Sequence, residues 1–261
     1  SYPGDIFYLH SKMIERACYL DKEHGEGSMT FLPIVEILEG DLTAFVPSNL
    51  VSMTDGQIML DAALFGEGQK PALDLGLSVS RVGTKVQWPI IKELSGSLRL
   101  EFLQFRELQK ATKLRAGAQL SDEVIDQLKS GEILTLLLRQ DKNQPVIMEA
   151  LVIILIGFKR KYLQKLPHME AVKRLQVEIY DFAKQRNPEF LKTLRQRRKM
   201  DPEIEKGLID ILEAYVQKVI EEEKKKAPLE TQEAVEEDGI IANIGKDVLD
   251  EATTKKKEEK S

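Results

Sequence analysis

The sequence has little of what disulfide-rich, metal-binding or membrane-spanning proteins need. It contains one cysteine, Cys18, which excludes an internal disulfide framework and fits a reducing compartment. Its three histidines, His10, His24 and His168, are isolated, and no His/Cys pair has the spacing of a zinc site, so we expect no metal site. The longest apolar run, 150–158, is far shorter than the ~20 residues of a spanning helix.

An excess of basic charge is also missing. The chain has 43 acidic and 38 basic residues, a net charge of −5. Residues 221–261 hold 13 Asp and Glu against 8 Lys, so the remainder, with 30 of each sign, is neutral. A neutral body argues against a nucleic-acid partner. We expect the basic cluster at 195–199 to be a solvated face at a helix end.

A P-loop is absent from the sequence. That motif needs a glycine-rich turn followed by Lys and Ser/Thr, because backbone N–H groups and the ammonium meet the phosphates there. The segment Gly66-Glu67-Gly68-Gln69-Lys70 is only superficially similar, since Pro71 stands where Ser/Thr is needed. We predict a plain turn at this position.

Residues 1–88 combine short β-type runs with helical spacing. The predicted strands are 29–37, 50–53 and 73–82, with 50–53 buried. A helix over 6–20 would place Phe7, Ile14, Ala17 and Cys18 on one face, with Cys18 as a small core residue. Strands that alternate with helices predict an α/β layer with a parallel sheet.

From residue 89 the strand signals fade and helical spacing takes over. The predicted helices cover 98–108, a segment that Ser121 caps, 145–166, 169–186, 188–199 and 202–222. These form a helical bundle over 89–222. Residues 223–261 carry Lys and Glu blocks and are expected to be mostly disordered. The predicted fold class is therefore α/β followed by all-α.

One segment, Gly76-Leu77-Ser78-Val79-Ser80-Arg81-Val82-Gly83, places an arginine after an apolar strand. A guanidinium at the carboxyl edge of an open α/β sheet lies where ligands bind, and its fork suits a transferring phosphoryl group. The alternative is an arginine paired with a carboxylate inside the domain. Spacing alone favours this alternative.

Four motifs in the same order, PGDIFYLHS, LTAFVPSNLVSMTDGQI, GLSVSRVG and SGSLRLEF, resemble the alpha subunits of F-type ATP synthases. The similarity runs from Tyr2 to about Arg139 and more loosely to about Ile220. It implies that residues 1–88 are the C-terminal portion of a RecA-like nucleotide-binding domain and that the helical C-terminal domain follows. The family's P-loop and its Mg-side Asp would lie upstream of Ser1.

The resemblance implies a role in a complex. Alpha subunits alternate with beta subunits in a six-membered ring around a central gamma subunit, and catalysis occurs mainly in beta. The complex makes ATP from ADP and phosphate, driven by a transmembrane proton gradient. The implied cofactor is ATP or ADP with Mg. The implied location is peripheral, on the cytoplasmic face of a bacterial-type plasma membrane, with only indirect contact to the membrane.

The resemblance also implies site residues. Arg81 corresponds to an arginine finger that reaches the γ-phosphate in beta, and Ser78 to a position needed for activity. Ser52 and Val79 match positions of the same shared pocket. A second, non-catalytic site next to the adenine matches Phe65, Lys70, Pro71 and Gln140. Two of its positions depart from the family: Lys70 replaces arginine, and Lys142 replaces a second glutamine, so adenine packing is implied but not its hydrogen bonds.

A second hypothesis belongs to another class. If no P-loop precedes this sequence, the chain would be a P-loop-free ring scaffold that only contacts partner subunits of a related hexameric ATPase. A chain like this, taken alone, is expected neither to hydrolyse ATP nor to bind it tightly.

Overall fold

The computed structural model describes residues 4–37, 41–114 and 121–226. These belong to two compact units. Unit 1 combines Ser1–Asp61 with Leu73–Val86, and unit 2 combines Ala62–Ala72 with the chain from Gln87 onward. The segment Ala62–Ala72 therefore lies with the helices, although in sequence it interrupts unit 1.

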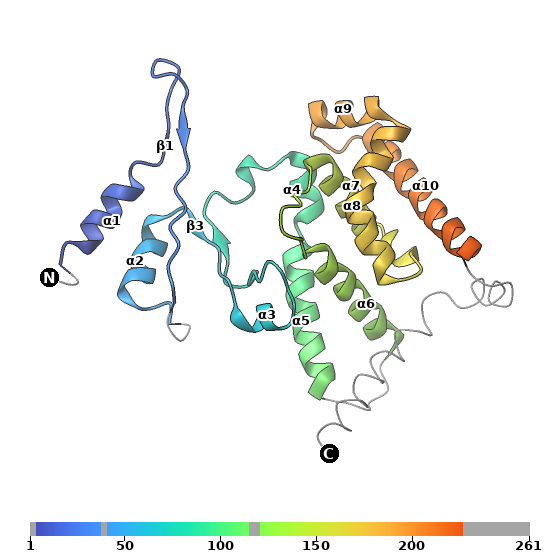
Figure 1. Ribbon diagram of the computed structural model, residues 1–261, viewed down its shortest axis with the longest axis horizontal. Coiled ribbons are helices and arrows are strands. Elements are labelled where there is room, and N and C mark those ends of the chain that lie inside the picture. Colours follow the sequence, from blue (N-terminus) through green and yellow to red (C-terminus); the bar gives the residue numbers. More distant parts are fainter. Residues whose placement is uncertain (1–3, 38–40, 115–120, 227–261) are drawn as a thin grey trace. The chain divides into compact units, whose positions relative to one another are not determined.

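In the described residues of unit 1 there are two α-helices and two short antiparallel strand pairs (Figure 1). The helices α1 and α2 pack on one another, β1 and β2 form a hairpin, and β3 pairs with β4. The bounds are α1 Ile6–Ile14, β1 Cys18–Tyr19, β2 Ser28–Met29, α2 Phe45–Met53, β3 Gly56–Gln57, β4 Val79–Ser80 and the 3₁₀ turn η2 Gly83–Val86. Among the described residues of this unit only Pro47 is buried.

The predicted parallel sheet is wrong for the described residues, because both strand pairs are antiparallel and two residues long. The predicted strand at 50–53 lies inside α2. A four-residue apolar run does not distinguish a buried strand from a helix, since neither period can be read over that length. The predicted strand at 29–37 shares only Met29 with β2, and the one at 73–82 shortens to β4. The residues of β2 and β4 are exposed, so these strands lack the burial that is typical of a long parallel strand.

The predicted helix over 6–20 ends at Ile14, and the chain turns into the β1–β2 hairpin. Cys18 lies in β1 and is exposed, so its prediction as a core residue is wrong. Phe7 and Ile14 share the helix, whereas Ala17 and Cys18 lie beyond its end. The apolar residues keep helical spacing in the sequence for about one turn beyond Ile14, where the helix ends.

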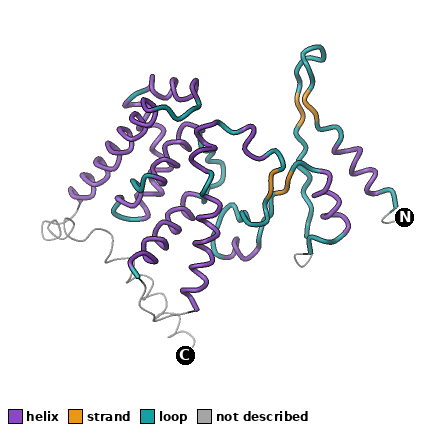
Figure 2. Tube along the Cα trace, turned by 180° about the vertical axis from the view of Figure 1, so that it is seen from behind, coloured by secondary structure: helices purple, strands orange, loops and turns teal. Residues whose placement is uncertain are grey.

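Unit 2 is an all-helical body (Figures 1 and 2). Its core joins α4, α6, α7, α8, α9 and α10, and fully buried side chains such as Ile153, Leu175 and Tyr215 fill it. The bounds are α3 Ala62–Gly66, α4 Pro89–Ser95, α5 Leu98–Leu114, α6 Asp122–Leu137, α7 Met148–Lys159, the 3₁₀ turn η3 Leu163–Lys165, α8 Met169–Arg186, α9 Pro188–Arg197 and α10 Pro202–Lys226.

The helices of unit 2 follow the sequence pattern closely. Helix α8 has the predicted bounds. Ser121 stands at the N-cap position of α6, but its side chain makes no capping hydrogen bond. The helix predicted over 145–166 is shorter, because α7 ends at Lys159 and Lys161 adopts a positive φ of 59°. Helix α10 continues to Lys226, four residues into the predicted tail; the rest of that tail, 227–261, lies outside the described residues. No described helix is both long and apolar enough to cross a bilayer.

Candidate functional site

Arg81 follows β4 in unit 1 and is bound to the end of α2. Its Nη1 donates to the Ser52 carbonyl over 3.0 Å and its Nη2 to the Val51 carbonyl over 3.1 Å. Its backbone N–H donates to the Asp55 carbonyl over 2.7 Å. Within the described chain the guanidinium forms no ion pair, so a carboxylate partner, which spacing alone favoured, is not what holds this side chain.

The end of a helix is a favourable place for such a cation. The last carbonyls of α2 have no partner within the helix and carry the negative end of its dipole. Thr54 satisfies the Leu50 carbonyl through its Oγ1 at 2.9 Å, and Arg81 satisfies the next two. Carbonyls orient the guanidinium without cancelling its charge, and three of the five arginine N–H donors remain free of these bonds.

Ser78 is held on both sides by backbone groups. Its Oγ donates to the Asp74 carbonyl over 2.6 Å and accepts the Met59 N–H over 3.0 Å. Asp74 in turn caps the turn before β4, since its Oδ1 accepts the N–H groups of Gly76 and Leu77. These bonds fix the chain that leads to Arg81. The hydroxyl of Ser78 therefore links this segment to the backbone at Asp74 and Met59.

Ser52 and Val79 lie near Arg81 in unit 1. Ser52 offers its carbonyl to the guanidinium, and its own Oγ donates to the Asn49 carbonyl over 2.7 Å. Val79 pairs with Gln57 in the β3–β4 ladder, and its side chain is exposed. The ladder needs glycine at position 56, because a Cβ there would lie 2.3 Å from the Val79 carbonyl oxygen.

The second predicted group lies wholly within unit 2. Phe65 belongs to α3 and is 61% exposed, which is unusual for a phenylalanine. The Lys70 ammonium lies 5.2 Å from the centre of that ring. The Lys70 carbonyl accepts the backbone N–H of Gln140 over 2.9 Å, which joins the two segments next to Pro71.

This group provides an aromatic surface and one amide. The Gln140 side chain donates from Nε2 to the Gln144 carbonyl over 2.8 Å. This bond fixes the orientation of the Gln140 amide, whose Oε1 can still accept a hydrogen bond. Lys142 is exposed in the loop between the two. The turn predicted at 66–70 is confirmed by the bonds from Gly68 N to Phe65 O and from Gln69 N to Leu64 O.

The basic cluster at 195–199 is used in contacts of unit 2. Arg195 pairs with the buried Glu149 over 3.2 Å, and Arg197 pairs with Glu203 over 2.6 Å. The Arg198 guanidinium lies 5.1 Å from the centre of a Trp88 ring. The cluster therefore joins neighbouring elements of the bundle in addition to facing solvent.

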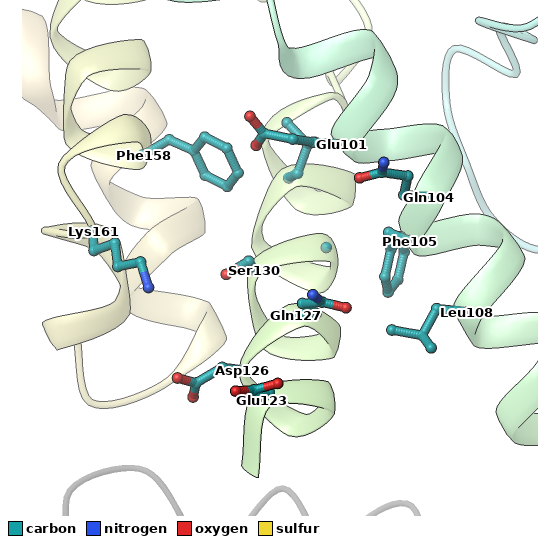
Figure 3. Close-up of a pocket in the computed structure, with 12 residues that line it drawn as sticks. Glu101, Gln104, Phe105, Leu108, Glu123, Asp126, Gln127, Ser130, Phe158 and Lys161 are labelled. Carbon is teal, nitrogen blue, oxygen red and sulfur yellow. The ribbon is translucent and has the colours of Figure 1, made fainter. Parts of the chain in front are cut away.

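A groove of about 450 Å³ lies between α5 and α6 in unit 2 (Figure 3). Phe105 and Leu108 line it from α5, Asp126 and Gln127 from α6, and Lys161 from the chain after α7. None of the predicted site residues lines this groove, and we assign it no function.

Two family descriptions match the chain. Residues 1–80 match the nucleotide-binding domain of the ATP synthase alpha/beta family, and residues 87–215 match the C-terminal domain of the ATP synthase alpha/beta chain. The chain is 40% identical to ATP synthase subunit alpha of Aquifex aeolicus over 220 residues, 84% of this chain. It is 39% identical to ATP synthase subunit alpha of Syntrophomonas wolfei over 215 residues, 82% of this chain. The chain belongs to the ATP synthase alpha/beta family.

Membership in the ATP synthase alpha/beta family confirms the resemblance and the fold class, an α/β nucleotide-binding part followed by a helical domain. The chain spans less than half the length of the curated relatives it matches, 43% and 42% of them. The roles of individual residues stay predictions.

Several residues of both groups were missed by sequence reasoning. Val51 and Asp55 contact Arg81 only through backbone carbonyls, which no side-chain pattern reveals. Gln69, Arg106 and Arg139 surround the Lys70 turn, and their partners are distant in sequence. A glycine in the TDGQI motif, Gly56, was the one available signal, since its position next to a strand indicates close backbone approach.

Proposed function

We propose that this chain acts as the non-catalytic alpha subunit of a rotary ATP synthase and supplies Arg81 to a catalytic site in a neighbouring beta subunit. The complex would make ATP from ADP and phosphate, driven by a proton gradient. The observation that carries the proposal is the similarity to alpha subunits over more than four fifths of the chain. The exposed Arg81 is consistent with this role.

In this proposal Arg81 stabilises charge on the γ-phosphoryl group during transfer. The Ser52 and Val51 carbonyls hold the guanidinium before the reaction, so little reorganisation is needed at that moment. The remaining N–H donors bind phosphoryl oxygens. Arginine fingers contribute ~10³–10⁵ in rate. Ser78 positions the segment that bears Arg81, and Val79 and Ser52 line the shared pocket.

We further propose that unit 2 contacts the adenine of a bound, non-hydrolysed nucleotide. The exposed Phe65 ring and Pro71 supply apolar contact, and the Gln140 amide oxygen accepts from the base. Lys70 over the ring adds positive charge beside the nucleotide. Among the described residues, no group of three or more His, Cys, Asp or Glu side chains is arranged to hold a metal ion, so no step is assigned here to Mg.

The proposed partners are beta subunits, alternating with this chain in a hexamer, and a central gamma subunit. Unit 1 exposes large apolar side chains, including Leu32, Ile34, Phe45, Ile58 and Leu60. Exposed apolar surface of this extent is typical of contact with further protein, which supports assembly. The proposed location is peripheral, on the cytoplasmic face of the membrane, reached through the complex.

The proposal is tested by isolating the tagged chain from its source cells under native conditions. We expect a ring-sized complex with equal amounts of this chain and a beta-type subunit, and ATP hydrolysis by that complex. The isolated chain should not hydrolyse ATP.

Two results would contradict this assignment. A ring that forms without any ATP hydrolysis would favour the scaffold hypothesis. Binding of ATP to the isolated chain with a micromolar Kd in calorimetry would place a complete nucleotide site in this chain alone, against the proposal.

A further inference from the structure

The segment Ala62–Ala72 carries three of the four proposed base-site residues, and it belongs to unit 2. Leu64 and Ala72 are buried at its two ends, 8% and 7% exposed. Between them Gln69, a polar residue, is also only 7% exposed. The segment is therefore anchored in the helical unit, and its conformation depends on the contacts that it makes with that unit.

Two consecutive residues after α6 bind two consecutive residues of the segment. Arg139 Nε donates to Gln69 Oε1 over 3.4 Å, and Gln140 N–H donates to the Lys70 carbonyl over 2.9 Å. Two adjacent bonds fix both the distance and the register of the segments. We refer to these two bonds, Arg139–Gln69 and Gln140–Lys70, as the clamp. Gln140 is itself a proposed base contact, so the clamp also fixes its position relative to Lys70.

A third bond reaches the segment from α5. Arg106 Nη1 donates to Glu67 Oε2 over 2.8 Å, with side chains that are 23% and 48% exposed. An ion pair this exposed contributes less than a bond to a buried group. The amide of Gln69 is buried, and loss of its charged donor leaves a buried acceptor with one partner fewer. Because Gln69 is buried, we expect Arg139 to be the stronger of the two anchors, although its bond is the longer one, 3.4 Å against 2.8 Å.

We propose that Arg139, supported by Arg106, is a positioning residue for the base site, acting through Gln69 and Lys70 and without contact to the ligand. This inference rests on the proposed function, because it presupposes that Phe65, Lys70 and Gln140 bind a nucleotide base. It assigns control of that site to the helices α5 and α6 of unit 2. The segment that bears Arg81 belongs to unit 1 and is not part of this clamp.

The test uses the full chain, labelled with ¹⁵N, and adenosine as the probe. Adenosine lacks phosphates, so it reports on the base site alone. Adenosine is titrated into the millimolar range, and the changes in the chemical shifts of the amides at 65–72 and 138–144 give its Kd. We expect Arg139→Met to weaken adenosine binding about three- to tenfold, the value of one typical hydrogen bond. Arg106→Met should weaken it less.

Further variants separate positioning from general destabilisation. Gln69→Met should weaken binding as Arg139→Met does, and the double variant should be no weaker than either, because both remove the same bond. Arg139→Lys keeps a cationic donor and should recover part of the affinity. The control is Arg174→Met on α8, which removes ion pairs to Glu178 and Glu222 elsewhere in unit 2. It should change the Tm but not the Kd.

The outcomes distinguish this inference from the proposed function. Wild-type affinity in Arg139→Met and Gln69→Met, with adenosine still shifting the amides at 65–72, would overturn the positioning role alone. Additive losses in the double variant would overturn it too. If adenosine shifts none of these amides in the wild-type chain, the base site itself is wrong, and both proposals about it fail.

Discussion

The guanidinium of Arg81 donates a hydrogen bond to the carbonyl of Ser52 over 3.0 Å, although 29 residues separate the two in sequence. The contact joins the turn after β4 to the last turn of α2. It means that the side chain proposed to act on a neighbouring subunit's substrate is already oriented by its own chain. A fixed cation at an exposed edge is what an arginine supplied to a partner's site requires.

Close packing of α5 on α6 depends on Gly131. A Cβ at this position would lie 1.9 Å from a ring carbon of Phe105, so Gly131→Ala forces the two helices apart. We expect a loss of about 1–3 kcal/mol in the free energy of unfolding, measured with urea. Gly96→Ala is the matched control, since its Cβ would meet nothing closer than 3.5 Å, and it should leave stability nearly unchanged. Equal effects of the two variants would contradict this packing.

The carboxylate of Glu149 is buried at the start of α7 and depends on Arg195. The residue is 3% exposed, Oε1 lies 3.2 Å from Arg195 Nε, and Oε2 has no hydrogen-bond partner within the described structure. Arg195→Met should therefore lower the free energy of unfolding by about 1–3 kcal/mol. The double variant with Glu149→Met should regain most of it, because no buried charge remains.

The control for that pair is Lys192→Met, which removes the exposed ion pair to Glu189 on the same helix. Exposed ion pairs contribute ~0–1 kcal/mol to stability, so we expect almost no change in the free energy of unfolding measured by chemical denaturation. A double variant that is less stable than Arg195→Met alone would show that the buried carboxylate is not the source of the loss.

Glu132 in α6 gives a pH dependence with a definite sign. Burial raises the pKa of this carboxyl above its ordinary value of 4.5, against a smaller opposite effect of Lys129. The folded state then holds the proton more tightly than the unfolded state, so the contribution of this group to stability falls as the pH rises through and above 4.5. Glu132→Gln should be more stable than wild type near pH 7 and should lose this part of the pH profile. The control is Glu107→Gln, which neutralises an exposed carboxyl on α5 and should leave the stability near pH 7 almost unchanged.

How much could be read from the sequence differs between the units. In unit 2 the long helices have apolar periodicity and end signals of their own, so local patterns predicted most of them, and the bounds of α8 are the predicted ones. The short helices α3 and α4 were not predicted, because five and seven residues are too few to show a helical period. In unit 1 the strands are two residues long and exposed, and their pairing depends on contacts such as Gly56 with Val79 that no local pattern encodes. Arg81 was identified locally, but its carbonyl partners come from a helix end about 30 residues earlier.

The base site shows the same limit. Phe65 and Gln140 are grouped only by the resemblance. The bond that joins their segments, from Gln140 N–H to the Lys70 carbonyl, links residues far apart in sequence and leaves no periodic signal. The anchors Gln69 and Arg139 were missed for the same reason, and a buried glutamine in a polar turn looks like a surface residue in sequence.

Lys70 can be tested by restoring the residue that the family resemblance implies. A guanidinium is planar and stacks on an aromatic face better than an ammonium does. Lys70→Arg should therefore tighten adenosine binding to the full chain about two- to fivefold. Lys12→Arg is a matched control, because Lys12 also lies over an aromatic ring, 4.4 Å from that of Tyr8, but in unit 1. Affinity that is unchanged or weaker in Lys70→Arg would contradict the proposed stacking.

The central claim is that Arg81 acts on the substrate of a partner subunit. The direct measurement is ATP hydrolysis by the assembled complex that contains Arg81→Ala, with its assembly checked by size and subunit ratio. We predict loss of cooperative multi-site turnover, by about 10³-fold or more, in a ring that assembles normally. An assembled Arg81→Ala ring that hydrolyses ATP near the wild-type rate would contradict the account.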